Sequence, residues 1–283
     1  MTANEMIAQV KDLPLVTPAA LRLLSLLDDT GASNTDIIQL LKHDSVLTAK
    51  ILRACNSPIF GFEDSVSSID QAVLILGHQQ VLQLVLSLSF GASMLVPMPG
   101  YALEAQELWR HALTTGSAAE LIVSCGFGFG AEASVAFTAG LLHDFGKPVT
   151  APFLTPEKQA AIRRLVEQER RSRVDAEAEV LGADHCATGA GLLQRWRLPD
   201  TIIEAVAHHH HPVLEPRPQL SAVVHVANCM AHLAGSAPGC EAYALRAEDE
   251  VASALQISAE TVQSLVISVQ EASVKMERFM RVS

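Results

Sequence analysis

The chain has 283 residues, a formal net charge of −11 at pH 7, and 49% hydrophobic residues with only 5% aromatic ones. Because nucleic-acid affinity rests mainly on Lys and Arg neutralising phosphates, a chain this acidic would repel DNA or RNA, and neither is expected as a partner. A core rich in Leu, Val, Ile and Ala and poor in aromatic rings is typical of packed helices. The composition therefore predicts an all-α fold.

The first third of the chain shows the pattern of short helices. Apolar residues at helical spacing, bounded by capping residues and turns, predict helices over residues 18–27, 34–41, 45–54, 68–76 and 81–96. The strongest break follows at Val96-Pro97-Met98-Pro99-Gly100, because two prolines and a glycine cannot continue a helix. We therefore end an N-terminal helical lobe, residues 1–97, at this break.

Helical patterns continue beyond the break. They predict a second lobe over residues 98–235 and a C-terminal helical extension over residues 236–283. The individual segments are 102–125, 132–143, 156–173, 176–196, 199–209, 220–233 and 258–280. No segment alternates with the period of two that a half-buried strand requires. The pattern thus agrees with the fold class that the composition predicts.

The cysteines and the apolar tracts indicate the compartment. Five cysteines are scattered without a CxxC pair, which favours reduced thiols that serve as small core residues in a cytoplasmic protein. The first residues show no basic stretch followed by an apolar core, so no secretory signal is expected. The longest apolar tract, residues 81–97, is interrupted by polar residues and predicts a buried helix rather than a membrane span. We expect a cytoplasmic protein without a membrane partner.

An adjacent histidine and aspartate, His143 and Asp144, end an apolar helical pattern. Together they can bind one metal ion, because the imidazole supplies a nitrogen and the carboxylate supplies charge. Lys147 follows one turn later near Asp144 on the same face, where its ammonium could hold a phosphate oxygen. Most His-Asp pairs at helix ends only bond backbone groups, and the other such pair here, His43-Asp44, is assigned no chemistry.

Further histidines favour the metal interpretation of this pair. His111 lies upstream in a long helical pattern, and His185 lies in a later one. A run of four, His208 to His211, follows before Pro212.

The order His, His-Asp, His, His-His resembles the HD superfamily of metal-dependent phosphohydrolases, especially its HDOD and HD-GYP branches. The first lobe resembles HDOD proteins in particular, and the similarity covers roughly residues 10 to 235. The motifs that carry it are Leu13-Pro14-Leu15, the stretch 44–52 that is similar to DPxLxxxxL, Asn56-Ser57 followed by Phe60, and Ser68-Ile69-x-x-Ala72-Val73-x-x-Leu76-Gly77.

The resemblance implies a helical fold with an HD-type site in the second lobe. It implies a mono- or dinuclear centre for a divalent metal, with Fe, Mn, Zn and Ni as candidates. The implied ligands are His111, His143, Asp144, His185, His209 and His210, and Asp144 and Lys147 would be the catalytic residues of an active enzyme. The last two ligands follow from Ala205-Val206-x-x-His209-His210-x-Pro212, which is similar to the family pattern AIxxHHxP; a register shifted by one residue stays open.

Two departures from the pattern bear on activity. Asn228 stands where catalytic HD proteins usually have an aspartate, so a charged ligand is replaced by a neutral amide, which we expect to leave weak or partial metal occupancy. The Gly-Tyr-Pro loop of the HD-GYP phosphodiesterases is also absent after the histidine run, where Val213-Leu214-Glu215-Pro216 stands.

Two functions follow from the resemblance. The first is a regulatory signal-transduction module that binds partner proteins or a small ligand, and we place it ahead because the first lobe carries no chemical residues of its own. The alternative is a metal-dependent phosphohydrolase or phosphodiesterase that acts on a nucleotide or cyclic dinucleotide, with a metal ion activating water and Lys147 steadying the phosphate.

Overall fold

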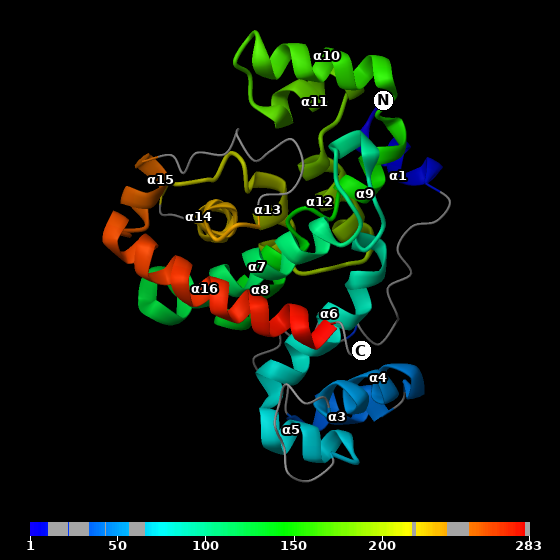
Figure 1. Cartoon of the computed structure of the whole chain (residues 1–283), viewed down its shortest axis with the longest axis vertical. Helices are drawn as coiled ribbons and strands as arrows, with labels where there is room; N and C mark the ends of the chain where they lie inside the picture. The colour runs from blue at the N-terminus through cyan, green and yellow to red at the C-terminus, as the bar shows by residue number, and fades with distance from the viewer. Residues whose placement is uncertain are drawn as a thin grey trace.

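The computed structural model describes residues 1–10, 22, 34–42, 44–56, 66–216, 219–236 and 249–280. Within these ranges the fold is all-α (Figure 1), with one isolated β-bridge between Met98 and Leu103. The predicted fold class is therefore confirmed. None of the described helices combines the length and apolarity that crossing a membrane requires. The predicted helix over 18–27, the Leu13-Pro14-Leu15 motif and Cys240 lie outside the described residues.

Three short helices form a small lobe at one end of the molecule (Figure 1): α3 (Asn34–Lys42), α4 (Ser45–Cys55) and α5 (Ile69–Leu76). Capping side chains begin two of them. Asp44 accepts a hydrogen bond from the backbone N–H of Leu47 at 3.0 Å, and Ser68 accepts one from Gln71 at 3.1 Å. The aspartate of the His43-Asp44 pair thus acts as a helix cap.

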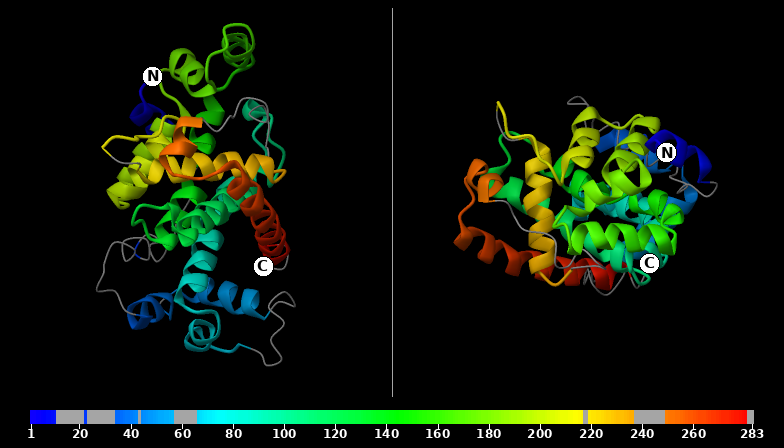
Figure 2. Two further views of the ribbon diagram at one scale, coloured as in Figure 1. Left: turned by 90° about the vertical axis from the view of Figure 1, so that its left-hand side faces the viewer. Right: turned by 90° about the horizontal axis from the view of Figure 1, so that it is seen from above.

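A long helix, α6 (His78–Met94), connects this lobe to the rest of the molecule (Figure 2). It packs against α4 and α5 at one end and against α7 and α8 at the other. Val81, Leu84 and Val85 are buried along it, as expected for the apolar tract. Because α6 contributes to both packing layers, the two lobes share one hydrophobic core cluster.

The second lobe contains the helices that carry the candidate site. They are α7 (Glu107–Ile122), α8 (Ala133–Leu142), α9 (Lys147–Thr150), α10 (Pro156–Glu167), α11 (Arg173–Leu181), α12 (His185–Arg195), α13 (Asp200–His208) and α14 (Leu220–Leu233). Two helices follow, α15 (Asp249–Ala254) and α16 (Ala259–Met280). The central helix is α7, which packs against α8, α14 and α16.

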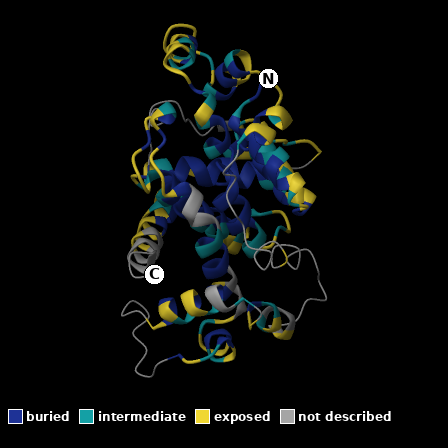
Figure 3. Ribbon diagram, turned by 90° about the vertical axis from the view of Figure 1, so that its right-hand side faces the viewer, coloured by how far each residue is buried: buried dark blue, intermediate teal, exposed yellow. Residues whose placement is uncertain are grey.

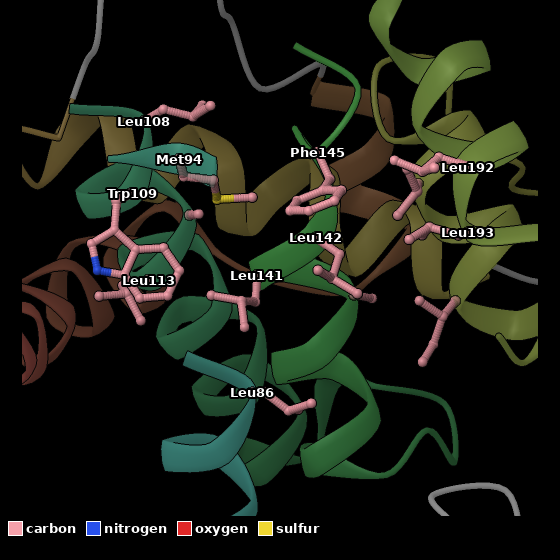
Figure 4. Close-up of a cluster of buried hydrophobic side chains, with 14 of the residues drawn as sticks. Leu86, Met94, Leu108, Trp109, Leu113, Leu141, Leu142, Phe145, Leu192 and Leu193 are labelled. Atoms are coloured by element: carbon pink, nitrogen blue, oxygen red, sulfur yellow. The ribbon is translucent and has the colours of Figure 1, made fainter. Parts of the chain in front are cut away.

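The burial of α8 sets the depth of the site. Residues 136–142 of this helix are all buried, and Figure 3 shows that the buried residues gather in the middle of the molecule. Leu141 and Leu142 of α8 pack in a cluster that includes Leu86 of α6 and Leu113 of α7 (Figure 4). A helix that is apolar on all sides must be surrounded by protein, so the residues that follow its C-terminus are buried as well.

The predicted single helix over 176–196 is wrong. The structure has two helices, α11 and α12, separated by a sharp turn. Gly182 adopts a φ of +90°, a left-handed conformation that glycine takes without steric cost, and it ends α11. Asp184 then begins α12 by accepting a hydrogen bond from Ala187 N–H at 2.7 Å. The turn makes His185 the first residue of a new helix.

The first helix, α1 (Ala3–Gln9), does not belong to the small lobe in space. It packs against α12 and α9 of the second lobe, and the terminal amine of Met1 donates to the carbonyl of Leu181 at 3.3 Å. The division of the chain at residue 97 therefore stays a prediction. In sequence α1 precedes that division, but in space it packs against the second lobe.

The turn before α9 lies very close to the backbone of α12 at Gly146. A Cβ at Gly146 would lie 1.8 Å from the carbonyl oxygen of His185 and 2.7 Å from the backbone N of Gly189. Gly146→Ala should therefore destabilise the fold by about 3 kcal/mol, since two backbones would have to separate. Gly191→Ala on α12 is the control, because the nearest atom there is not backbone but the side-chain end of Ile7, its Cδ1, at 3.0 Å. Urea unfolding checks both variants, and equal midpoints would contradict the prediction.

Candidate metal centre

The carboxylate of Asp144 lies at the centre of four imidazoles. Its Oδ2 is 3.3 Å from Nε2 of His143 and 3.8 Å from Nε2 of His111. Its Oδ1 is 3.5 Å from Nε2 of His185 and 3.9 Å from Nε2 of His209. The structure thus brings together residues from the ends of α8 and α13, the start of α12 and the second turn of α7. Each of the four imidazoles presents the same ring nitrogen to the carboxylate.

The other ring nitrogen, Nδ1, of each imidazole contacts an oxygen acceptor. The pairs are His111 with Ser236 O at 2.8 Å, His143 with Gly140 O at 2.7 Å, His209 with Val206 O at 2.8 Å, and His185 with Glu177 Oε2 at 2.8 Å. An oxygen acceptor at Nδ1 requires the proton on that nitrogen, which leaves the lone pair on Nε2. The four rings are therefore held in the tautomer and orientation that suit a metal ligand.

Several of the inward atoms have no hydrogen-bond partner in the described part of the chain. They are Nε2 of His111, Nε2 of His143 and Oδ1 of Asp144, and all are buried. Leaving buried polar atoms unsatisfied costs about 1–3 kcal/mol each. A divalent cation would satisfy imidazole nitrogens and a carboxylate oxygen at once, so the donor set fits a metal ion.

The histidine run divides into inward and outward residues. His209 is buried, and Nε2 of His210 lies 3.3 Å from Nε2 of His185. His208 is half-buried and His211 is exposed, and they face Glu204 and Asp175 at the surface. The register that the resemblance favours, His209 and His210, is the one that the structure directs to the centre.

Lys147 contacts the central carboxylate directly. Its Nζ lies 2.7 Å from Oδ2 of Asp144, and both side chains are buried. Burial alone would raise the pKa of Asp144, but His143 and Lys147 outweigh it and hold the pKa of this carboxyl well below its ordinary value. The carboxylate is therefore ionised at neutral pH.

Two of the imidazoles, His111 and His209, are neutral because burial disfavours their charged form. Burial lowers the pKa of His111 to about 3, and burial together with His143 lowers the pKa of His209 well below its ordinary value. For His185, burial opposes a charge, but contacts with Cys186 and the Glu177 carboxylate raise its pKa well above the ordinary value. His111 and His209 therefore need lose no proton to bind a cation, whereas at His185 a cation competes with a second proton for Nε2.

Asn228 lies on the face of α14 that looks toward the centre. One turn before it, Nδ1 of His225 donates to the carbonyl of His209 at 2.9 Å, and one turn after it the ring of His232 lies 4.9 Å from that of His111. Oδ1 of Asn228 is buried and has no hydrogen-bond partner among the described residues. The amide at the position where the resemblance leads us to expect an aspartate is thus buried between two residues that contact the donor set.

Sequence reasoning missed Glu177, which is fully buried. Its carboxylate accepts hydrogen bonds from the backbone N–H and Nδ1 of His185, and from Nε of Arg173 at 3.0 Å. An unbroken helix over 176–196 would have put Glu177 about 12 Å from His185 along the axis. Only the turn at Gly182 brings the two together, so the sequence signal that could have revealed Glu177 is that glycine.

Replacing Glu177 with Gln should lower cation affinity about 10- to 100-fold, because the buried carboxylate orients His185 and increases its basicity. The matched control is Glu179→Gln, since Glu179 lies on the same helix but pairs with Arg171 at the surface. Competition with a chromophoric chelator measures both affinities. Equal affinities in the two variants would show that Glu177 does not support a ligand.

The fold and this donor set define an all-helical protein with a candidate metal centre built at helix ends. The chain belongs to the HDOD domain family, whose sequence model matches residues 13–212. An uncharacterized protein of Treponema pallidum (strain Nichols) is 26% identical to it over 235 residues, which cover 81% of this chain. The chain spans only 44% of the length of that relative.

Two solved structures share the fold. A protein of Marinobacter aquaeolei VT8 named "Putative signal transduction protein" is 23% identical with a TM-score of 0.76, over 95% of this chain and 60% of that one. A protein of Shewanella amazonensis SB2B named "Putative phosphohydrolase" is 23% identical with a TM-score of 0.68, over 97% of each chain. At this level of identity the likeness establishes the fold alone.

Proposed function

We propose that this chain is a signal-transduction module whose second lobe is held by a divalent cation in a closed centre that turns over no substrate. The observation that carries the proposal is burial. The side chains of His111, His143, His185 and His209 are 0% exposed, and that of Asp144 is 1% exposed. Structural metal sites are closed in this way, whereas catalytic sites keep a coordination position open to water or substrate.

The charge of the centre supports the same proposal. Asp144 is the carboxylate among the proposed ligands, and Lys147 already contacts one of its oxygens. Asn228 supplies no charge where an aspartate would. A hard cation such as Mn²⁺ is therefore held weakly, and partial occupancy is expected. The proposed ligands are His111, His143, Asp144, His185, His209 and His210, with Asn228 as a weak neutral donor.

Signalling proteins are the proposed partners, and the cytoplasm is the proposed compartment. Free thiols support the second point, since the four cysteines in the described residues form no disulfide: Cys55, Cys125, Cys186 and Cys229. The first lobe, by contrast, shows no group of metal-ligating side chains within its described residues. A lobe without such a group suits binding rather than chemistry.

A phosphohydrolase that acts on a nucleotide or cyclic dinucleotide is the second candidate. The ring of Tyr101 supports it, because Arg173 lies 4.8 Å and Lys147 lies 5.7 Å from the ring centroid. Two cations beside the centre could orient a phosphate. A bound divalent cation would supply Lewis-acid polarisation of a phosphoryl oxygen. Both cations, however, already contact buried carboxylates, Asp144 and Glu177.

Turnover assays separate the two candidates. The protein, purified without a histidine tag and supplied with Mn²⁺ or Fe²⁺, is incubated with a cyclic dinucleotide and with a nucleoside monophosphate. We expect no turnover above that of the Asp144→Ala variant. Robust metal-dependent turnover that Asp144→Ala abolishes would overturn the signalling proposal in favour of the enzyme.

A further inference from the structure

A buried cysteine lies inside the donor set. Cys186 follows His185 in the first turn of α12, and its Sγ lies 3.7 Å from Nδ1 and 4.0 Å from Nε2 of His209. The ligand atoms of His185, Cys186, His209 and His210 all lie within 4.8 Å of one another. Three imidazoles and one thiol therefore surround a common point on one side of Asp144.

The spacing of these atoms suits a tetrahedral cation. With Zn–N of about 2.05 Å and Zn–S of about 2.3 Å, a tetrahedron has edges of roughly 3.3 Å between nitrogens and roughly 3.6 Å between nitrogen and sulfur. The two Nε2 atoms of His185 and His210 are 3.3 Å apart, and Sγ of Cys186 is 4.0 Å from Nε2 of His209. One edge already matches, and the other requires a movement of a few tenths of an ångström.

The two oxygens of Asp144 point to different groups of ligands. Oδ1, which is buried and without a hydrogen-bond partner in the described structure, is the oxygen nearest to His185 and His209. Oδ2 faces His111, His143 and Lys147. The unsatisfied Oδ1 is a second observation, separate from the position of Cys186. It indicates that a cation would be stabilised on the side of the centre where His185 and His209 lie.

We propose that Cys186 is a thiolate ligand and that His185, Cys186, His209 and His210 form a zinc-selective subsite within the centre. This inference rests on the proposed metal centre. Thiolate and imidazole together select zinc over Mn²⁺ and Mg²⁺, which prefer oxygen ligands. The thiolate also supplies the negative charge that Asn228 does not. Zinc is therefore retained on this side even where a hard cation is held weakly.

Binding exchanges a proton for the metal. When zinc binds, the S–H bond breaks, a Zn–S bond forms and the proton leaves to the solvent, so that zinc binding weakens as the pH falls.

Cobalt(II) tests the proposal, because it replaces zinc and reports thiolate ligation by a charge-transfer band in the near ultraviolet. We expect this band in the natural protein loaded with Co²⁺, and in the control Cys125→Ser, which removes an exposed thiol three residues beyond the end of α7. Cys186→Ser should lose the band and bind zinc at least about tenfold more weakly. A chain in which Cys186 is the only cysteine should keep the band, which assigns it even if Cys186→Ser does not fold.

The outcomes distinguish this inference from the proposed function. Bound cobalt with visible ligand-field bands but no charge-transfer band in the natural protein would overturn the role of Cys186 and leave the metal centre intact. If no cobalt binds at all, both the subsite and the metal centre are overturned.

Discussion

Removing either partner of the Asp144–Lys147 pair is expected to destabilise the metal-free protein by about 3–5 kcal/mol, because one buried charge then loses its counter-charge. The two side chains are 1% and 2% exposed, and their charged atoms are 2.7 Å apart. Asp144→Asn keeps the shape of the carboxyl group, and Lys147→Met keeps most of the volume of the lysine. The effects on stability therefore report the charges rather than a cavity.

The double variant Asp144→Asn/Lys147→Met distinguishes this explanation from a general loss of packing. With neither charge present, it should be more stable than the sum of the two single effects predicts, by a coupling free energy of about 2 kcal/mol or more. Urea unfolding of all four proteins in the presence of a chelator gives the cycle. Strictly additive effects would show that the pair is not coupled and that Lys147 does not neutralise Asp144.

Replacing Asn228 with Asp should have opposite effects on the metal-free and metal-loaded protein. Without a cation, a carboxylate at this buried position lacks compensation, and the folded state should lose about 2 kcal/mol or more. With a cation, the added charge should raise the affinity by more than about tenfold, or 1.4 kcal/mol. Thermal unfolding with and without Mn²⁺, together with a direct binding titration, measures both effects.

The control for this variant is Asn228→Leu, which has the same number and branching of side-chain heavy atoms and no oxygen. It should not lower the stability of the metal-free protein, because the Asn228 oxygen that it removes has no partner among the described residues. It should bind metal no better than the natural chain. An Asn228→Asp variant with unchanged metal affinity would mean that position 228 does not reach the cation.

The part of the site that the sequence could predict is the part carried by a fixed order of residue types. The spacing of His111, His143-Asp144, His185 and the histidine run resembles one family, and that resemblance places these residues in one centre without knowledge of the helix packing. The sequence also indicated which two residues of the histidine run face the centre. That assignment, His209 and His210, came from the short pattern Ala205-Val206-x-x-His209-His210-x-Pro212.

The part that could not be predicted depends on turns and on packing between helices. Gly182 was read as an interior residue of one long helix, so neither the position of His185 at a helix start nor its contact with Glu177 was visible. Cys186 was interpreted as a small core residue, and it is buried as expected. Its contact with His209, however, arises only because α12 packs against α13. The seven residues of α1 are too few for their pattern to indicate which lobe they cover.

The existence of the metal centre is tested most directly by elemental analysis. The protein without a histidine tag and its His209→Ala variant are loaded with Zn²⁺, dialysed against metal-free buffer and analysed for bound metal. Loss of His209 removes an Nε2 donor that lies 3.9 Å from Oδ1 of Asp144 and whose other nitrogen is already fixed by the carbonyl of Val206. We predict that the natural chain retains zinc and that the variant retains less. If the natural chain gives up its zinc as completely as the variant, the buried histidines and Asp144 are not a metal centre.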